Sequence, residues 1–176
     1  SAKANRSLGF IKRNLHMCKP NVKATAYISL VRPHLEYSSS AWNPYTQENI
    51  NKLESVQHRA ARFVNKNYNW NIPGASIVDE LGWQTLEHRR RNRRLKLMFG
   101  AVNNISGLQI PVRLQQSSGR ITTHSRHPKS LIAPHCRTDT YRHSFFPRTI
   151  RDWNTLPPEL INCSDVNGFT RLLEHQ

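Results

Sequence analysis

Acidic residues are scarce in this sequence. Only 11 of the 176 residues are Asp or Glu, no two Asp are adjacent, and Asp79–Glu80 is the sole acidic pair. Metal-dependent polymerases and nucleases hold two Mg²⁺ ions with clustered carboxylates, so this scarcity argues against such chemistry. The motifs G-x-x-x-x-G-K-[ST], H-E-x-x-H and G-x-S-x-G are also missing. We therefore predict that the chain has no catalytic residues and no cofactor of its own.

Cysteine and long apolar runs are scarce as well. Cys18, Cys136 and Cys163 are far apart and form no C-x-x-C pair, which argues against a disulfide scaffold and for a reducing compartment. No apolar run approaches the length that spans a bilayer, and no signal peptide is recognisable. We expect an intracellular protein, nuclear and cytoplasmic, without a membrane partner. Because Ser1 lies inside a helical pattern, we also expect a segment of a longer chain.

Basic residues dominate what is present. Lys and Arg number 26, which gives a formal net charge of +15 and a pI near 10.6. Residues 1–100 carry a net charge of +11, and the remaining 76 residues carry +4. A domain this far from neutrality repels itself unless an anionic partner offsets its field. RNA, DNA or an RNA–DNA hybrid is the partner that we predict; an acidic membrane surface fits less well, because no helix shows a broad exposed aromatic face.

The first half of the sequence predicts helices. Residues 3–15, 21–31 and 46–66 show helical periodicity, and Pro33 predicts a kink or a new short helix. In the third helix a second face carries four cations among five positions, without the mixed signs of an ordinary solvated face. We interpret this stripe as a surface that follows phosphates. The candidate nucleic-acid contacts in these helices are Arg6, Arg13, Lys52, Arg59, Arg62 and Lys66.

A second group of cations lies in the helix predicted from Thr85 to Val102. Cations near a helix N-terminus oppose the helix dipole and repel one another. Folding stability does not account for such a run, whereas an anionic ligand does, so we predict docking on nucleic acid; nuclear localisation is the alternative. The candidate contacts here are Arg89, Arg90, Arg91, Arg93, Arg94 and Lys96.

The last third has a different character. Gly and Pro punctuate short extended runs at 120–125 and 130–134, which predict small hairpins or irregular strands. A short helix follows Pro147, and a final helix packs Phe169, Leu172 and Leu173 inward. The fold class that we predict is therefore mainly α: a thumb-like helical bundle (1–70), an Arg-rich helical connection (71–104) and a smaller irregular α+β C-terminal subdomain (105–176).

Two further patterns admit functional interpretations. His-x-x-His followed by His-Cys offers zinc ligands; the residues are His124, His127, His135, Cys136 and His143. Structural zinc sites usually contain more cysteine, so the favoured interpretation is that these histidines are polar loop residues or phosphate contacts. Four tryptophans invite base stacking. Because most of them flank turns or apolar positions, core packing is favoured for most, and Trp70 is the least obviously buried.

Several strings resemble a known family. They are KANRSLGFIKRNL (3–15), YISLVRPHLEYSSSAWNPYTQENINKLESVQHRAARFV (27–64), ELGWQTLEHRRRNRRLKLMF (80–99), RHSFFPRTIRDWNTLPPELI (142–161) and FTRLL (169–173). In this order they resemble the C-terminal part of non-LTR (LINE-type) retrotransposon reverse transcriptases, with the jockey and chicken-repeat clades looking closest. The resemblance runs over nearly the whole chain.

This resemblance implies a role. The catalytic aspartates of such polymerases lie in a Tyr/Phe-Ala-Asp-Asp motif of the palm, which is missing here, so Mg²⁺ is expected only for a palm outside this chain. Residues 1–70 would correspond to the thumb, which grips the primer–template duplex, and the rest to the post-thumb region. The implied function is to hold template–primer duplex or element RNA during target-primed reverse transcription, with the palm as a further partner.

Other functions fit parts of the pattern. The chain would act without a polymerase if it were a stand-alone nucleic-acid-binding protein derived from such an element. A His-metal nuclease would use the histidines of the zinc pattern and would require bound metal. A surface that recruits a host factor is neither favoured nor excluded by the sequence.

Overall fold

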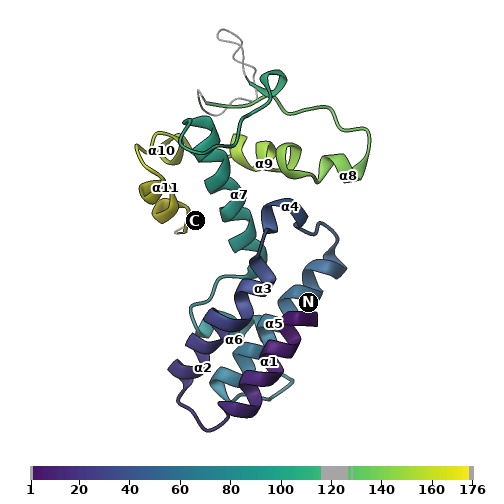
Figure 1. The fold of residues 1–176 in the computed structure, drawn as a ribbon, viewed down its shortest axis with the longest axis vertical. Helices are drawn as coiled ribbons and strands as arrows, with labels where there is room; N and C mark the ends of the chain where they lie inside the picture. Colours follow the sequence, from purple (N-terminus) through teal and green to yellow (C-terminus); the bar gives the residue numbers. More distant parts are fainter. Residues whose placement is uncertain (1, 116–126, 128, 175–176) are drawn as a thin grey trace. The chain divides into compact units, whose positions relative to one another are not determined.

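The computed structural model describes residues 2–115, 127 and 129–174 (Figure 1). Within these ranges every regular element is a helix, which confirms the mainly α prediction. The chain forms two compact units, Ser1–Arg90 and Arg91–Gln176, and the division falls inside helix α7 (Leu86–Val102). The three-part division at residues 70 and 104 rests on composition and resemblance and stays a prediction.

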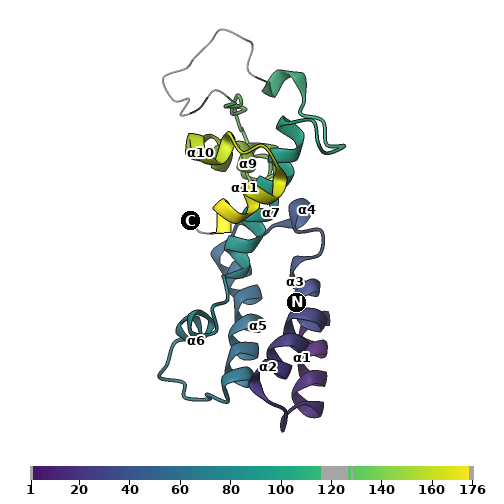
Figure 2. The ribbon, with the colours of Figure 1, turned by 90° about the vertical axis from the view of Figure 1, so that its left-hand side faces the viewer.

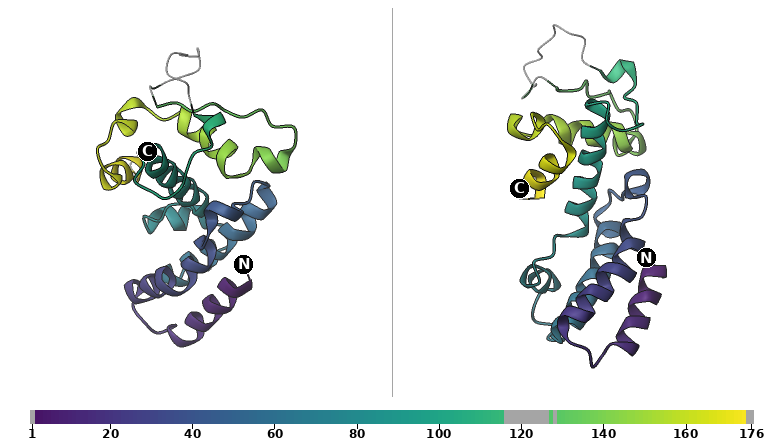
Figure 3. Two further views of the ribbon diagram at one scale, coloured as in Figure 1. Left: turned by 45° about the horizontal axis from the view of Figure 1, so that its top comes forward. Right: turned by 60° about the vertical axis from the view of Figure 1, so that its left-hand side comes forward.

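The first unit is built from three helical rods. In Figures 1 and 3, α1 and α5 run in the same direction, and the second rod returns beside both. The rods are α1 (Ala2–Asn14), the continuous succession of α2 (Pro20–Ala26), η1 (Tyr27–Val31) and α3 (Arg32–Glu36), and α5 (Gln47–Asn65). The short helix α4 (Ser39–Trp42) connects the second rod to the third.

A proline sets the path of the second rod. Pro33 has no N–H, and its ring would meet the carbonyl one turn back. The helix widens before it into the π turn η1, in which the Arg32 N–H donates to the Tyr27 carbonyl, five residues back. The interruption predicted at Pro33 is therefore a change of hydrogen-bond register within one rod.

Helix α1 enters the core through one apolar face. Ala4, Leu8 and Ile11 recur at helical spacing and form the buried face of α1.

A buried glutamine connects the rods to the start of α7. Across the core, the Tyr27 hydroxyl donates to Gln57 Oε1 (2.9 Å), and Gln57 Nε2 donates to the Gln84 carbonyl (2.9 Å). Burial raises the pKa of the Tyr27 phenol. The fully buried hydroxyl thus keeps a partner, which removes the cost of an unsatisfied donor.

Helix α6 (Gly74–Glu80) packs on the remaining side of α5. Figure 2 shows it on the side of α5 away from α1 and α2. The helix begins at Gly74, directly after Pro73. Glycine is needed there for space: a Cβ on residue 74 would lie 2.7 Å from His58 Cβ. The close approach of the two helices therefore depends on the absence of this side chain.

The N-terminus of α7 is capped from two directions. Thr85 Oγ1 accepts from the His88 N–H (3.2 Å), as the sequence predicted. The Glu54 carboxylate of α5 accepts from the Leu86 N–H (3.2 Å) and the Glu87 N–H (2.9 Å). A negative charge at this end also favours the helix dipole. Helix α5 thus fixes where α7 starts.

The second unit gathers short helices around the C-terminal part of α7. Its core contains Phe99, Trp153 and Phe169, with Phe99 and Phe169 stacked at 4.5 Å between ring centroids. The remaining elements are η2 (Val112–Leu114), α8 (Asp139–Arg142), α9 (Phe145–Asn154), α10 (Pro158–Ile161) and α11 (Val166–Glu174). In α11, Phe169 and Leu173 are buried as predicted, whereas Leu172 is about half exposed.

Three consecutive residues of α9 organise this unit. Asp152 pairs with Arg94 of α7 (2.8 Å), and Trp153 Nε1 donates to the Lys129 carbonyl (2.9 Å). Asn154 exchanges two hydrogen bonds with the backbone of Leu131, at 3.0 and 2.8 Å. The Asp-Trp-Asn sequence therefore fixes α7 and the chain around residues 129–131 to one helix.

The strands expected after residue 105 are not seen in the described part of this region. Residues 130–134 carry no regular structure, because the Asn154 carboxamide supplies the hydrogen bonds to Leu131 that a neighbouring strand would give. The other run, 120–125, lies outside the described residues. The α+β description of residues 105–176 is therefore replaced by short helices and irregular connections in the described ranges.

The contact between Gly74 and His58 gives a test of the packing. We expect Gly74→Ala to lower the free energy of unfolding by about 1–3 kcal/mol, because the added methyl forces α5 and α6 apart. Gly107→Ala is the matched control: a Cβ there meets nothing within 4 Å, and we expect a change within about 0.5 kcal/mol. Urea unfolding measures both, and equal stability of the two variants would contradict the tight contact.

Candidate nucleic-acid interface

The cationic stripe predicted on α5 divides in the structure. Lys52, Arg59 and Lys66 are exposed, and Lys66 ends the helix in a left-handed conformation (φ 52°). Lys52 pairs with Glu48 one turn earlier (2.6 Å), which offsets part of its charge. Arg62 is different, because its side chain is buried. The stripe is therefore a shorter cationic surface than helical spacing alone predicted.

Arg62 holds the chain that follows α5. Its Nη1 donates to the Asn69 carbonyl (2.7 Å) and its Nη2 to the Ile72 carbonyl (2.6 Å), and only 7% of the residue is exposed. A long side chain beside the helix end satisfies two carbonyls of the returning chain, and burial follows. The interpretation of Arg62 as an exposed phosphate contact is replaced by a structural role.

Arg59 lies where α5 meets α1. Its Nη2 donates to Asn5 Oδ1 of α1 (2.8 Å), and its Nε donates to the Ser55 carbonyl (3.2 Å). Neither acceptor carries a full negative charge. Burial and the nearby Arg59 charge lower the pKa of Lys12, which stands two turns after Asn5 on α1. Tertiary packing thus brings two cations together across the two helices.

The surrounding surface offers little to neutralise them. The first 35 residues contain seven Lys or Arg and no Asp or Glu. Arg6 and Arg13, both predicted contacts, are exposed on α1. We call Arg6, Lys12, Arg13 and Arg59 the α1–α5 surface. Like charges held together without carboxylates weaken folding slightly and attract an anion.

The arginine run on α7 is largely used in folding. Successive helical residues point 100° apart, so six cations within eight positions surround the helix instead of sharing a face. Arg89 pairs with Glu36, and Arg90 Nε donates to Asn43 Oδ1 (3.0 Å). Arg94 pairs with Asp152. The expectation that folding does not account for this run is therefore wrong for half of its cations.

The depth of these arginines separates them from the rest of the run. Arg90 and Arg94 are almost fully buried and Arg89 is partly buried, whereas Arg93 and Lys96 are exposed and Arg91 is partly exposed. Burial and the charge of Arg148 lower the pKa of Arg94, and the Asp152 carboxylate opposes this shift. Arg91, Arg93 and Lys96 are the cations of α7 that an external anion can reach.

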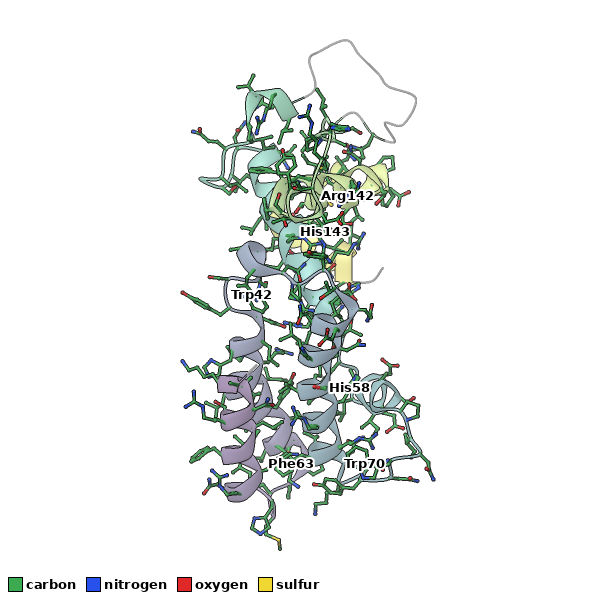
Figure 4. The ribbon with its side chains drawn as sticks, turned by 90° about the vertical axis from the view of Figure 1, so that its right-hand side faces the viewer. Trp42, His58, Phe63, Trp70, Arg142 and His143 are labelled. Atoms are coloured by element: carbon green, nitrogen blue, oxygen red, sulfur yellow. The ribbon has the colours of Figure 1, made fainter. Side chains whose placement is uncertain are left out.

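Sequence reasoning missed two groups of cations. The first is Lys12 of α1, for which the absence of acids in residues 1–35 was the available signal. The second group surrounds His143 between α8 and α9. Partial desolvation and the charges of Arg148 and Arg151 lower the pKa of His143, against the opposing charge of Asp139. Figure 4 labels Arg142 and His143 in this region.

The histidines of the zinc pattern are not brought together where the structure describes them. His127 is buried, and its Nε2 lies 3.1 Å from the Trp153 carbonyl. Cys136 Sγ lies 3.2 Å from the Pro134 carbonyl, and His135 is exposed. No group of three His, Cys, Asp or Glu residues suited to a metal ion occurs among the described residues. His124 lies outside them.

The tryptophans have different environments. Trp153 is fully buried, and Trp83 stacks on Tyr27 at 4.7 Å between ring centroids. Trp42 is partly exposed, and Trp70 is the most exposed of the four. Core packing is thus confirmed for Trp153 and, in part, for Trp83, and the expectation that Trp70 is the least buried is confirmed.

Comparisons with known proteins supply no family for this chain. No protein-family model, curated protein or solved structure matches it. In the part of the chain that the structure describes, no helix combines the length and apolar character needed to cross a membrane.

His58 of α5 is a titratable group that lies against Gly74 of α6. Burial of the imidazole lowers the pKa of His58; Glu54 opposes this shift and Arg62 adds to it. The neutral form is thus favoured in the folded chain, because the charged form would lose hydration.

The difference between the buried and the exposed cations of α7 gives a stability test. We expect Arg94→Ala to cost about 2–3 kcal/mol, somewhat less than breaking a fully buried ion pair because Asp152 stays partly hydrated. Lys96→Ala removes the same charge from the exposed side, and we expect a change within about 0.5 kcal/mol. Chemical denaturation followed by circular dichroism measures both losses. An Arg94→Ala variant as stable as Lys96→Ala would remove the structural role of Arg94.

The pKa of His58 predicts a pH dependence. Because the folded-state pKa lies below the unfolded value of about 6.5, the unfolded chain takes up the proton first as the pH falls. The stabilisation is fully present above about pH 6.5 and is lost as the pH falls through the folded-state pKa. We expect His58→Gln to reduce the loss of urea midpoint between about pH 7.5 and pH 5. An unchanged slope in His58→Gln would contradict the assignment.

Proposed function

We propose that this chain is a nucleic-acid-holding module without a catalytic centre of its own. The observation that carries the proposal is the α1–α5 surface, where the charge of Arg59 on α5 acts on Lys12 of α1 and where Arg59 donates to neutral oxygen atoms. The first 35 residues add six more cations and no acid. Phosphates are the ligands that relieve such repulsion along an extended surface.

The geometry favours recognition of a backbone over recognition of bases. Cations on two neighbouring helices of one bundle can contact phosphates along a duplex without entering a groove. An A-form-like RNA–DNA hybrid has a wide, shallow minor groove, which suits contact with a convex helical surface. Sequence-independent holding of a duplex is the function that these features support best.

The resemblance stated from the sequence gives this function a setting. We place the chain in the C-terminal, thumb and post-thumb part of a non-LTR retrotransposon reverse transcriptase, where it holds template–primer duplex or element RNA. The aspartates that bind Mg²⁺, and hence the polymerase activity, would belong to a palm outside this chain. A protein with this function would be found in the cytoplasm and the nucleus.

Equilibrium binding across a salt series tests the function. We expect the purified chain to bind RNA–DNA hybrid more tightly than duplex DNA in fluorescence anisotropy. The Lys12→Ala/Arg59→Ala double variant should bind the hybrid roughly tenfold more weakly at moderate salt and lose about two units of the salt slope, because two phosphate contacts are removed.

A matched variant separates local contacts from total charge. Arg113→Ala/Arg137→Ala also removes two exposed cations, both from the second unit, and we expect its affinity to stay within about twofold of wild type because every cation of the α1–α5 surface is kept. If both double variants lower the affinity for the hybrid equally, binding depends on total charge and the α1–α5 surface has no specific role. Absence of hybrid binding at moderate salt would refute the proposed function.

A further inference from the structure

The chain after α5 presents two aromatic side chains to solvent. Tyr68 is 56% exposed and Trp70 is 81% exposed, in the segment Asn67–Ile72 that leads to α6. Tryptophan is rarely left this open, because its burial is among the most favourable contributions to folding. In Figure 4, Trp70 lies on this segment, on the side of α5 opposite to the buried Phe63. Core packing does not account for Trp70.

The segment that carries these rings is fixed by hydrogen bonds. The Asn69 N–H donates to Asn67 Oδ1 (3.1 Å), and the Asn71 N–H donates to Asn69 Oδ1 (3.0 Å). Such Asx turns restrain the backbone locally. Arg62 holds the carbonyls of Asn69 and Ile72 from within. The exposed rings are therefore mounted on a restrained support, which lowers the entropy lost when they bind.

A cation accompanies the tryptophan ring. Arg62 Cζ lies 5.1 Å from the Trp70 ring centroid, within the range of a cation–π contact. The same guanidinium is bonded to the two backbone carbonyls, so the ring and the charge are positioned together. Lys66 is exposed at the start of the segment. The Trp70 ring is thus combined with positive charge, a combination that suits an aromatic ligand attached to phosphate.

We infer that Tyr68 and Trp70 form a stacking platform for unpaired nucleobases of RNA or DNA. Bases inside a duplex are already stacked on their neighbours, so only unpaired bases offer a free face to an aromatic side chain. Stacking tolerates any base and adds to phosphate contacts without reading sequence. A protein surface would also cover these rings, but the positive charge placed with them favours the nucleic acid.

This inference deepens the proposed function and rests on it in one respect. If the α1–α5 surface holds a duplex, the platform would bind the single-stranded stretch of the same nucleic acid. Affinity would then depend on the extension as well as the duplex. The two sites differ in physical character, because phosphate contacts change with salt whereas base stacking changes little.

Substitution of Trp70 tests the platform. The ligands are a blunt RNA–DNA hybrid, the same hybrid with a single-stranded extension of DNA or of RNA, and free single strands of about twelve nucleotides. We expect Trp70→Ala to weaken binding of the single strands by about five- to fiftyfold and to abolish the affinity gained from either extension, without changing the salt slope. Binding of the blunt hybrid should stay within about twofold.

Two controls keep the result specific. Trp70→Phe retains an aromatic face and should restore most of the lost affinity, and thermal unfolding by circular dichroism should show each variant folded. Tryptophan emission should fall when wild type binds single strands, and the fall should be smaller in Trp70→Phe. If Trp70→Ala binds single strands as tightly as wild type, the platform inference is overturned, and a protein partner becomes the ligand to seek.

The outcomes separate this inference from the proposed function. If Lys12→Ala/Arg59→Ala weakens every ligand in proportion while Trp70→Ala changes none, the duplex-holding function stands and the platform fails. If Trp70→Ala weakens the single strands alone while Lys12→Ala/Arg59→Ala changes nothing, the platform stands and the α1–α5 surface fails.

Discussion

Guanidinium groups that enter the interior need oxygen acceptors, and in this chain the charged acceptors, the carboxylates, are few. Lys and Arg outnumber Asp and Glu by 26 to 11, so carboxylates cannot pair with most of the cations. The fold therefore gives Arg89 and Arg94 a carboxylate each and gives Arg62 two backbone carbonyls. Leaving any of these charges buried without its acceptor would cost more than the contact gains. The path of the chain after α5 and the packing of α9 on α7 both depend on these bonds.

The same constraint decides which cations remain for a ligand. Arginines that secure the fold are removed from the surface, and exposed cations remain on α1, on α5, on α7 and elsewhere in the second unit. No acidic residue lies within the first 35 positions, so nothing in the local sequence balances the charge of α1. A surface of this kind weakens folding slightly through repulsion and gains from an anionic ligand, which is the physical basis of the proposed nucleic-acid function.

The proposed stacking platform arises from the structural role of Arg62. The bonds that bring Asn69 and Ile72 back towards α5 also place Trp70 beside a fixed charge and outside the core. One buried arginine thus secures a turn and prepares an aromatic surface. Holding a duplex through phosphates and an adjoining single strand through stacking are complementary tasks, because neither depends on base sequence. The proposed role in a polymerase thumb would require this independence from sequence.

The sequence by itself determined the helical class, the positions of α1, α5 and α7, and the strongly cationic character, because periodicity, capping by Thr85 and composition are local properties. It could not determine which cations face outward. Helical spacing placed Arg62 beside Arg59, yet the returning chain covers one and leaves the other open. Similarly, residues 130–134 have the composition of a strand, but the Asn154 side chain satisfies Leu131 and makes a partner strand unnecessary there. Tertiary structure decided these points, since burial and hydrogen-bond partners depend on residues that are distant in sequence.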